Sequence, residues 1–161
     1  MASFLRVIRQ ARWLKHPDWE WLSPCGIQSD ALGDLQTRNN RLSVYRVESD
    51  EETEQVVVAL AANRDNLANL DYALFDHSQL TETQFAICQE DGETPDLRVN
   101  KWHYDIRNLT VSKLVELASV VSSGCHVRVS KKEIEKLLRL AIRAGNLDKS
   151  RVNRGLLAKI E

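Results

Sequence analysis

Three sets of residues in this chain have side chains that can do chemistry: the pair Cys125 and His126, three aspartates, and the pair Arg98 and His103. Cys125 and His126 place a thiol beside an imidazole, and Asp71, Asp76 and Asp105 are carboxylates able to hold or move a proton. Neighbouring residues of a strand point to opposite faces, so we expect Cys125 to be a buried thiol and not a nucleophile activated by His126. Nothing in the spacing requires the three aspartates to meet.

Arg98 and His103 have an R-x4-H spacing that resembles the site of one large group of helical ribonucleases. Those enzymes place the two residues at the end of a helix, whereas here they lie in a segment with strand composition, which would point them to opposite faces. The chain also lacks a G-x-S-x-G elbow, a P-loop and a dinucleotide-binding glycine fingerprint. We therefore predict no catalytic residue. An enzyme without a single-sequence motif, for example a nuclease, is kept as one alternative.

The sequence predicts neither a metal site nor a cofactor. Its four histidines are widely separated and no C-x-x-C pair is present, which argues against structural zinc. An acidic cluster at Asp50, Glu51, Glu52 and Glu54 follows Ser49 at the start of a predicted helix. Carboxylates stabilise a helix N-terminus through the helix dipole, whereas a hard cation needs oxygens that converge from several directions.

Positive charge is concentrated near the C-terminus. Residues 128–159 contain ten Lys or Arg and three Asp or Glu, a net charge of +7, whereas the whole chain carries −1. Such a segment indicates an anionic partner, and the competing explanation is solvated charge or pairing with the acidic part of the same chain. The residues that we predict to contact a partner are Lys132, Lys136, Arg139, Arg143, Arg151 and Arg154.

Two predicted helices present these cations. Ser130 and Glu133 form a capping box, after which apolar residues at helical spacing leave the first four cations on the opposite face. Gly145 is expected to end this helix, and Asp148 to cap a second one. The buried line of the second helix is expected at Val152, Leu156 and Ile160.

The spacing of Ala141 and Gly145 resembles that of DNA-binding helix-turn-helix pairs. Arg151 departs from that pattern, because an apolar residue usually packs there. A simple αα-hairpin that packs on a sheet explains the same spacing.

The rest of the chain predicts an α+β fold with a small mixed sheet of three to four strands and a crossover helix, followed by a helical, basic C-terminal region. Strands are expected at Leu42–Glu48, Asp71–Phe75, Phe85–Gln89 and Leu97–Ile106, with a short β-like segment at Cys125–Val129. Helices are expected at Phe4–Leu14, from Ser49 to about Arg64, and from Thr110 to Val121. The first two strands and the helix between them fit a βαβ unit with parallel strands. Trp19 and Trp21 are expected to lie in an extended segment packed on the core, before a turn at Ser23–Gly26.

Composition and length favour one domain over 1–161, with a soft internal boundary near Leu109 between a mixed acidic part and a helical basic part. The N-terminus lacks a signal-peptide pattern, no apolar run is long enough for a membrane span, and three widely spaced cysteines indicate reduced thiols. We therefore expect a cytoplasmic protein without membrane contact; the sequence leaves its oligomeric state open. The leading hypothesis is a non-enzymatic interaction module, a regulatory or accessory subunit that engages an acidic partner through its basic C-terminal helices. The alternative partner is nucleic acid, bound by a helix-turn-helix-like hairpin.

Overall fold

The structure is a computed structural model that describes residues 2–14 and 26–160. Trp19, Trp21 and all but the last residue of the expected 23–26 turn lie outside the described residues. The described strands are β1 (Ser3–Ile8), β2 (Leu42–Val47), β3 (Leu70–Asp76), β4 (Ala86–Gln89), β5 (His103–Arg107) and β6 (Cys125–Val129). The α-helices are α1 (Asp50–Ala62), α2 (His77–Glu82), α3 (Leu97–Asn100), α4 (Val111–Ser123), α5 (Lys131–Arg143) and α6 (Arg154–Ile160). Short 3₁₀-helices are η1 (Gln10–Arg12), η2 (Ser29–Leu35) and η3 (Lys149–Arg151).

The described strands form one sheet in the order β4-β5-β2-β1-β3-β6, in which each neighbouring pair is antiparallel. The α+β class is confirmed. The predicted sheet is too small, and the described pairings are antiparallel instead of mixed. Two strands account for its greater size: β1, in a segment for which the spacing predicts a helix, and β6, which is a full edge strand paired with β3.

The predicted N-terminal helix is wrong because β1 is a central strand with both faces buried. Phe4 and Ile8 pack in the core on one side of the sheet, and Leu5 packs in the core on the other side. A strand buried on both faces loses the alternation of polar and apolar residues that identifies a strand in a sequence. The apolar positions of this segment then coincide with helical spacing.

β2, α1 and β3 follow one another as predicted, but β1 lies between the two strands. Because both strands pair antiparallel with β1, they run parallel to each other without being neighbours. This arrangement is the split form of the βαβ unit. Ser49 caps α1 by accepting a bond from the Glu52 N–H at 3.1 Å, at the predicted start of this helix.

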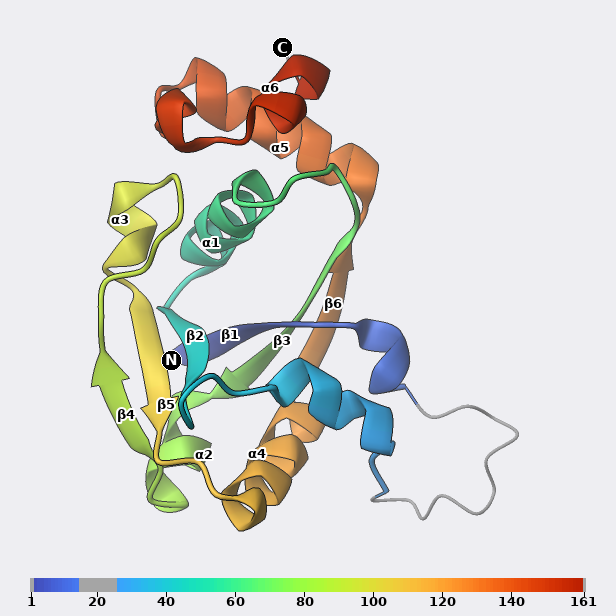
Figure 1. The fold of residues 1–161 in the computed structure, drawn as a ribbon, viewed down its shortest axis with the longest axis vertical. Helices are drawn as coiled ribbons and strands as arrows, with labels where there is room; N and C mark the ends of the chain where they lie inside the picture. The colour runs from blue at the N-terminus through green and yellow to red at the C-terminus, as the bar shows by residue number, and fades with distance from the viewer. Residues whose placement is uncertain (1, 15–25, 161) are drawn as a thin grey trace.

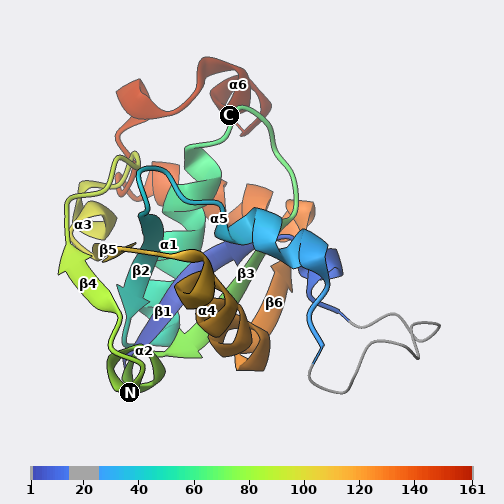
Figure 2. The ribbon, with the colours of Figure 1, turned by 60° about the horizontal axis from the view of Figure 1, so that its bottom comes forward.

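Helices cover both sides of the sheet, which gives a layered molecule (Figures 1 and 2). The α1 face packs against α1, α3, α5 and α6, and the α4 face packs against α2, α4 and η2. Two separate hydrophobic cores result, one on each side of the sheet. On the α1 face, α5 packs along α1 and carries the C-terminal α6.

The strand predicted at 97–106 is correct only in its second half. Asp96 is buried, and its carboxylate accepts bonds from the N–H groups of Arg98 at 2.9 Å and Val99 at 3.4 Å. These bonds cap the short helix α3, so β5 begins only at His103. β5 pairs antiparallel with β4.

The C-terminal helix pair differs from the prediction in its connection. Gly145 has a φ of 72°, and the Asn146 N–H donates to the carbonyl of Ala141 at 2.9 Å, which ends α5 where predicted. Asp148 then caps η3, and α6 begins only at Arg154. The predicted apolar line of Val152, Leu156 and Ile160 is buried. The helices in the described part of the chain are all too short or too polar to span a membrane.

Replacing Leu138 by alanine tests how firmly α5 is bound to the rest of the fold. Leu138 is 1% exposed, so truncation leaves a cavity, and we expect the free energy of unfolding to fall by about 2–5 kcal/mol. Leu140, on the same helix, is 52% exposed, so Leu140→Ala is the matched control and should change stability by less than about 0.5 kcal/mol. Urea denaturation of both variants measures the difference. Equal effects of the two substitutions would show that α5 is not packed as described.

Candidate functional site

The first candidate surface is the outer side of α5, which carries four of the six predicted partner-binding residues. Ile134 and Leu138 are buried toward α1. At 3.6 residues per turn, the four cations on the other side fall within a stripe about 60° wide. These cations, Lys132, Lys136, Arg139 and Arg143, line a groove of about 340 Å³ together with Glu135 and Leu140. We call this surface the α5 stripe.

Only part of the α5 stripe is neutralised by the chain itself. Lys136 lies 3.4 Å from Glu133, and Arg139 lies 2.9 Å from Glu135. Lys132 and Arg143 are exposed and make no ion pair with another described residue. The two pairs that do form are surface pairs within one helix, which are weak and easily exchanged for a partner's carboxylates.

The other two predicted residues lie apart from the α5 stripe. Arg151 belongs to η3 and Arg154 is the first residue of α6, and both are exposed. This end of the hairpin is tied to the loop between α1 and β3, where Asn153 donates to Asp65 at 2.9 Å. A ten-residue connection separates α5 from α6, so the hairpin lacks the short turn of a DNA-binding helix pair.

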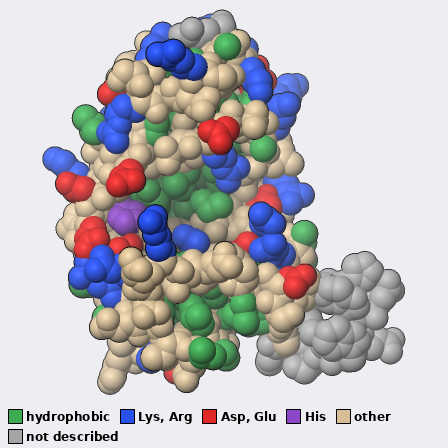
Figure 3. All heavy atoms as spheres, in the orientation of Figure 1, with side chains coloured by type: hydrophobic (Ala, Val, Ile, Leu, Met, Phe, Trp, Pro, Cys, Tyr) green, Lys and Arg blue, Asp and Glu red, His purple; other side chains and the backbone are tan. Residues whose placement is uncertain are grey.

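A second candidate is a cavity of about 380 Å³ in the α1 face of the sheet, which the sequence does not predict. Figure 3 shows a hollow on this side of the molecule, with hydrophobic side chains inside it and a histidine and Lys or Arg side chains at its edge. Leu5, Val7 and Leu60 supply apolar walls, and the loop 90–94 forms a polar rim. We call it the polar cavity.

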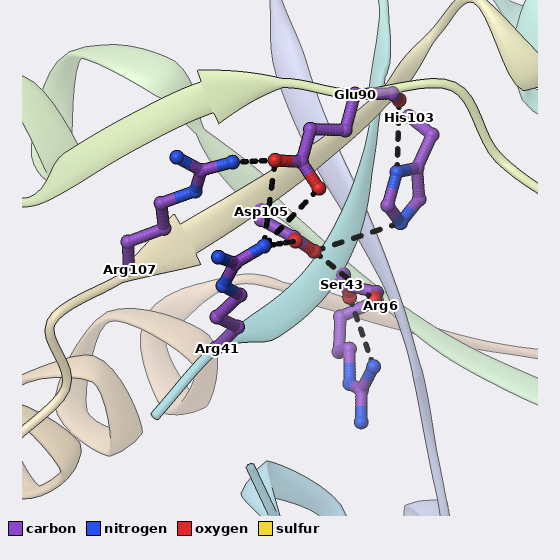
Figure 4. Close-up of polar contacts among 7 residues, drawn as sticks. All are labelled: Arg6, Arg41, Ser43, Glu90, His103, Asp105 and Arg107. Carbon is purple, nitrogen blue, oxygen red and sulfur yellow. Dashed lines mark hydrogen bonds and ion pairs between the residues drawn. The ribbon is translucent and has the colours of Figure 1, made fainter. Parts of the chain in front are cut away.

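The floor of the polar cavity is a ladder of polar residues on β2 and β5. Ser43 pairs with Asp105 and Tyr45 pairs with His103, and antiparallel partners point to the same face of a sheet. Arg41 precedes this ladder and brings its Nη1 to 3.3 Å from a carboxylate oxygen of Glu90 (Figure 4). These positions face the helical layer, where a layered fold normally buries apolar side chains. Polar residues at inward positions of a sheet are a signal of function.

Asp105 is a buried carboxylate with few hydrogen bonds. It is 7% exposed and accepts one bond from the Ser43 hydroxyl at 3.3 Å. Arg41 Nη1 and His103 Nε2 are each 3.8 Å from its oxygens. A carboxylate has about four acceptor positions, so Asp105 keeps capacity for a donor on a ligand.

His103 is held as a neutral base. Its Nδ1 lies 3.0 Å from the backbone carbonyl of Glu90, which can only accept, so Nδ1 carries the proton and Nε2 keeps its lone pair. Burial lowers the pKa of His103, and the charges of Asp105 and Glu93 offset only part of this effect. Burial also raises the pKa of the neighbouring Tyr45 hydroxyl to about 12. The polar cavity therefore offers acceptors at Nε2 of His103 and at Asp105.

The rim of the polar cavity is fixed before any ligand binds. The backbone N–H and the hydroxyl of Thr94 both donate to Asn100 Oδ1 at 2.7 Å, and the Asn100 amide donates back to the Thr94 carbonyl at 3.0 Å. Both residues are buried. Gly92 packs so closely on His103 that an added Cβ would lie 3.2 Å from the His103 Cβ. A preordered rim lowers the entropy that a ligand must overcome.

The residues that the sequence offers for catalysis lie apart in the structure. Arg98 bonds to Asp96 and lines a hollow between α1 and α5, whereas His103 lies in the polar cavity. Asp71 and Asp76 lie at opposite ends of β3, where Asp76 caps α2. Asp105 is three strands away on β5.

The prediction that Cys125 is a buried thiol is wrong, because this residue begins the edge strand β6 and is exposed. His126 is engaged elsewhere: its Nε2 lies 2.8 Å from the Val121 carbonyl, and its ring packs on Trp13.

The state of His103 can be measured directly by NMR. We expect long-range ¹H–¹⁵N spectra to show the proton on Nδ1, and a titration to give a pKa below the value of about 6.5 found in unfolded chains. Between these two pKa values the folded protein binds fewer protons than the unfolded chain. The stability of the wild type relative to His103→Gln should therefore rise with pH through that window and level off above about pH 6.5. A proton on Nε2, or a pKa above that of the urea-unfolded protein, would contradict this account.

No group of three or more His, Cys, Asp or Glu among the described residues is arranged to hold a metal ion. In comparisons with known proteins, no family model, no curated protein and no solved structure matches this chain.

Proposed function

We propose that this protein is an interaction module that binds an acidic segment of a partner protein through the α5 stripe. One observation carries the proposal: four cations and the half-exposed Leu140 share one groove on a single helix face, with Glu135 as the one carboxylate lining it. Water solvates an isolated surface cation, but several cations in one stripe produce a field that attracts and orients an anionic partner.

The chemistry of the groove favours an amphipathic acidic helix as the partner segment. Carboxylates spaced three and four residues apart can pair with Lys132, Lys136 and Arg143, which follow the same helical spacing along α5. An apolar residue on the same face of the partner can pack on Leu140. The buried anchors of α5 hold the stripe in place, so little ordering is needed on this side of the interface.

The geometry favours an acidic protein over nucleic acid. The half-exposed Leu140 in the groove can pack against an apolar side chain, which a protein segment has and a phosphate backbone lacks. Arg151 and Arg154, which a helix-turn-helix reading assigns to base contacts, lie on a different part of the hairpin, and α6 has seven residues. Recognition helices place several side chains along a groove of DNA, which this short helix is poorly suited to do.

Two charge-reversal variants distinguish these partners. Lys132→Glu with Arg143→Glu changes the unpaired ends of the α5 stripe, and Arg151→Glu with Arg154→Glu makes the same charge change on the other part of the hairpin. For a partner recovered from native lysate, we expect the first variant to bind roughly tenfold or more weakly, about 0.7 kcal/mol for each reversed charge. The second variant should stay within about threefold of the wild type. Affinity capture followed by titration of the recovered partner measures both.

Nuclease treatment of the lysate is the control for nucleic acid. Retention of the partner after nuclease treatment, with loss only in the α5 variant, supports the proposal. Loss on nuclease treatment, or a stronger effect of the Arg151 and Arg154 variant, would assign the surface to nucleic acid instead. Far-UV circular dichroism confirms that each variant is folded before binding is compared.

A further inference from the structure

A second cavity adjoins the polar cavity and has the opposite electrostatic character. It has a volume of about 620 Å³ and lies where β1 ends, between η2 and the loop that follows α1. Arg6 and Val7 line both cavities, so the two meet along β1. Arg6, Arg9 and Arg64 face this second space, together with Asp34 and Asp71. We call it the arginine cavity.

The two carboxylates of the arginine cavity are already occupied by other donors. Asp34 accepts bonds from the backbone N–H of Arg9 at 2.7 Å, from the Trp13 indole at 2.9 Å and from Arg12 at 3.0 Å. The acceptor positions of the Asp34 carboxylate are therefore largely filled without any contribution from the guanidinium groups of Arg6, Arg9 or Arg64.

Asp71 is bound in the same way from the other side. It accepts both N–H groups of the Arg128 guanidinium, at 2.7 and 2.9 Å, and the backbone N–H of Gln10 at 3.0 Å. The fork of Arg128 lowers the pKa of Asp71 more than any other contact. Arg12 and Arg128 thus neutralise the two aspartates, and the three arginines that face the cavity keep their charge.

None of these three arginines forms an ion pair with a described residue. Arg6 donates only to carbonyl oxygens, to Asp34 O at 2.9 and 3.2 Å and to Ser43 O at 2.8 Å (Figure 4). Arg64 donates to the carbonyl of Asn69 at 2.9 Å. Arg9 is exposed at the mouth. Burial lowers the pKa of both Arg6 and Arg64, because each has lost part of its hydration without gaining a bound carboxylate.

We propose that the two cavities together bind a small phosphate monoester, with its phosphate in the arginine cavity and its hydroxyl or amine groups in the polar cavity. Three arginines, Arg6 on β1, Arg9 just after it and Arg64 just after α1, line one space, and the planar fork of arginine matches phosphate oxygens in paired hydrogen bonds. A bound dianion supplies the counter-charge that no carboxylate of the described residues provides to these three arginines.

The other end of the ligand follows from the acceptors of the polar cavity. Asp105 and the Nε2 of His103 require donors, so this part of the ligand must carry hydroxyl or amine groups. Leu5, Val7 and Leu60 line the space between, where a short carbon skeleton packs. Each cavity is of the size that binds part of a small organic molecule, and a phosphorylated sugar or nucleoside has the required chemistry at both ends.

Isothermal titration calorimetry at low ionic strength tests the assignment with inorganic phosphate, ribose 5-phosphate and ribose as probes. We expect saturable binding of both phosphates, tighter binding of ribose 5-phosphate, and no binding of ribose at millimolar concentration. Arg64→Gln and Arg9→Gln change residues that are not core packing residues, and each should weaken both phosphates at least tenfold. Lys113→Gln removes a cation from α4 and should leave both affinities within about twofold.

A third variant separates the two ends of the site. Asp105→Asn should leave the affinity for inorganic phosphate unchanged and reduce that for ribose 5-phosphate to the same level. Absence of saturable phosphate binding, or equal binding by wild type and Arg64→Gln, would overturn the proposal. Equal affinity of the wild type for the two phosphates would overturn the assignment of the polar cavity. These outcomes are independent of the α5 variants, which do not touch either cavity.

Discussion

The placement of Arg6 on the central strand is the constraint on which much of this structure depends. A guanidinium held close to a hydrophobic core must have its donors satisfied, because an unbonded polar group there costs several kcal/mol. Arg6 meets this need with carbonyls at the end of η2 and in β2. The last carbonyls of a helix have no partner within the helix, so the Asp34 carbonyl near the end of η2 can accept from Arg6. The carboxylate of Asp34 then ties Arg12 and Trp13 to the same point.

The sequence reveals some elements and hides others, according to whether the interactions that form each element are local. The helices at Ser49, Thr110 and Ser130 are readable because each begins with a side chain that bonds its own first turn, and such bonds are local. β1 is not readable, since its neighbours β2 and β3 come from residues far along the chain. A strand buried on both faces and carrying a charge at its centre follows no local pattern.

The candidate sites divide in the same manner. The α5 stripe follows from helical spacing within thirteen residues, so the sequence predicts its four members. The polar cavity depends on the register of β2 with β5, which brings Ser43 to Asp105 across sixty-two residues. The alternation of His103, Asp105 and Arg107 predicts only a polar face of a strand. It does not predict that α1 and α3 leave this face open to a hollow. The signal in the sequence is that polar residues alternate in both partner segments, at Arg41, Ser43 and Tyr45 as well as at 103–107.

The two cationic surfaces differ in what an unpaired charge signifies. An exposed lysine or arginine keeps its hydration, so leaving it unpaired costs little, and a partner gains mainly association rate and orientation from it. Salt screens that contribution within about 10 Å at 0.1 M. Arg6 and Arg64 have given up part of their hydration and have received carbonyl dipoles in return. An anion that reaches them meets a field that water screens much less, so a ligand there gains binding free energy as well as orientation. For this reason a chain with a net charge of −1 can still bind an anionic ligand. Pairing between side chains within the fold, and not the total charge, decides which cations remain available to that ligand.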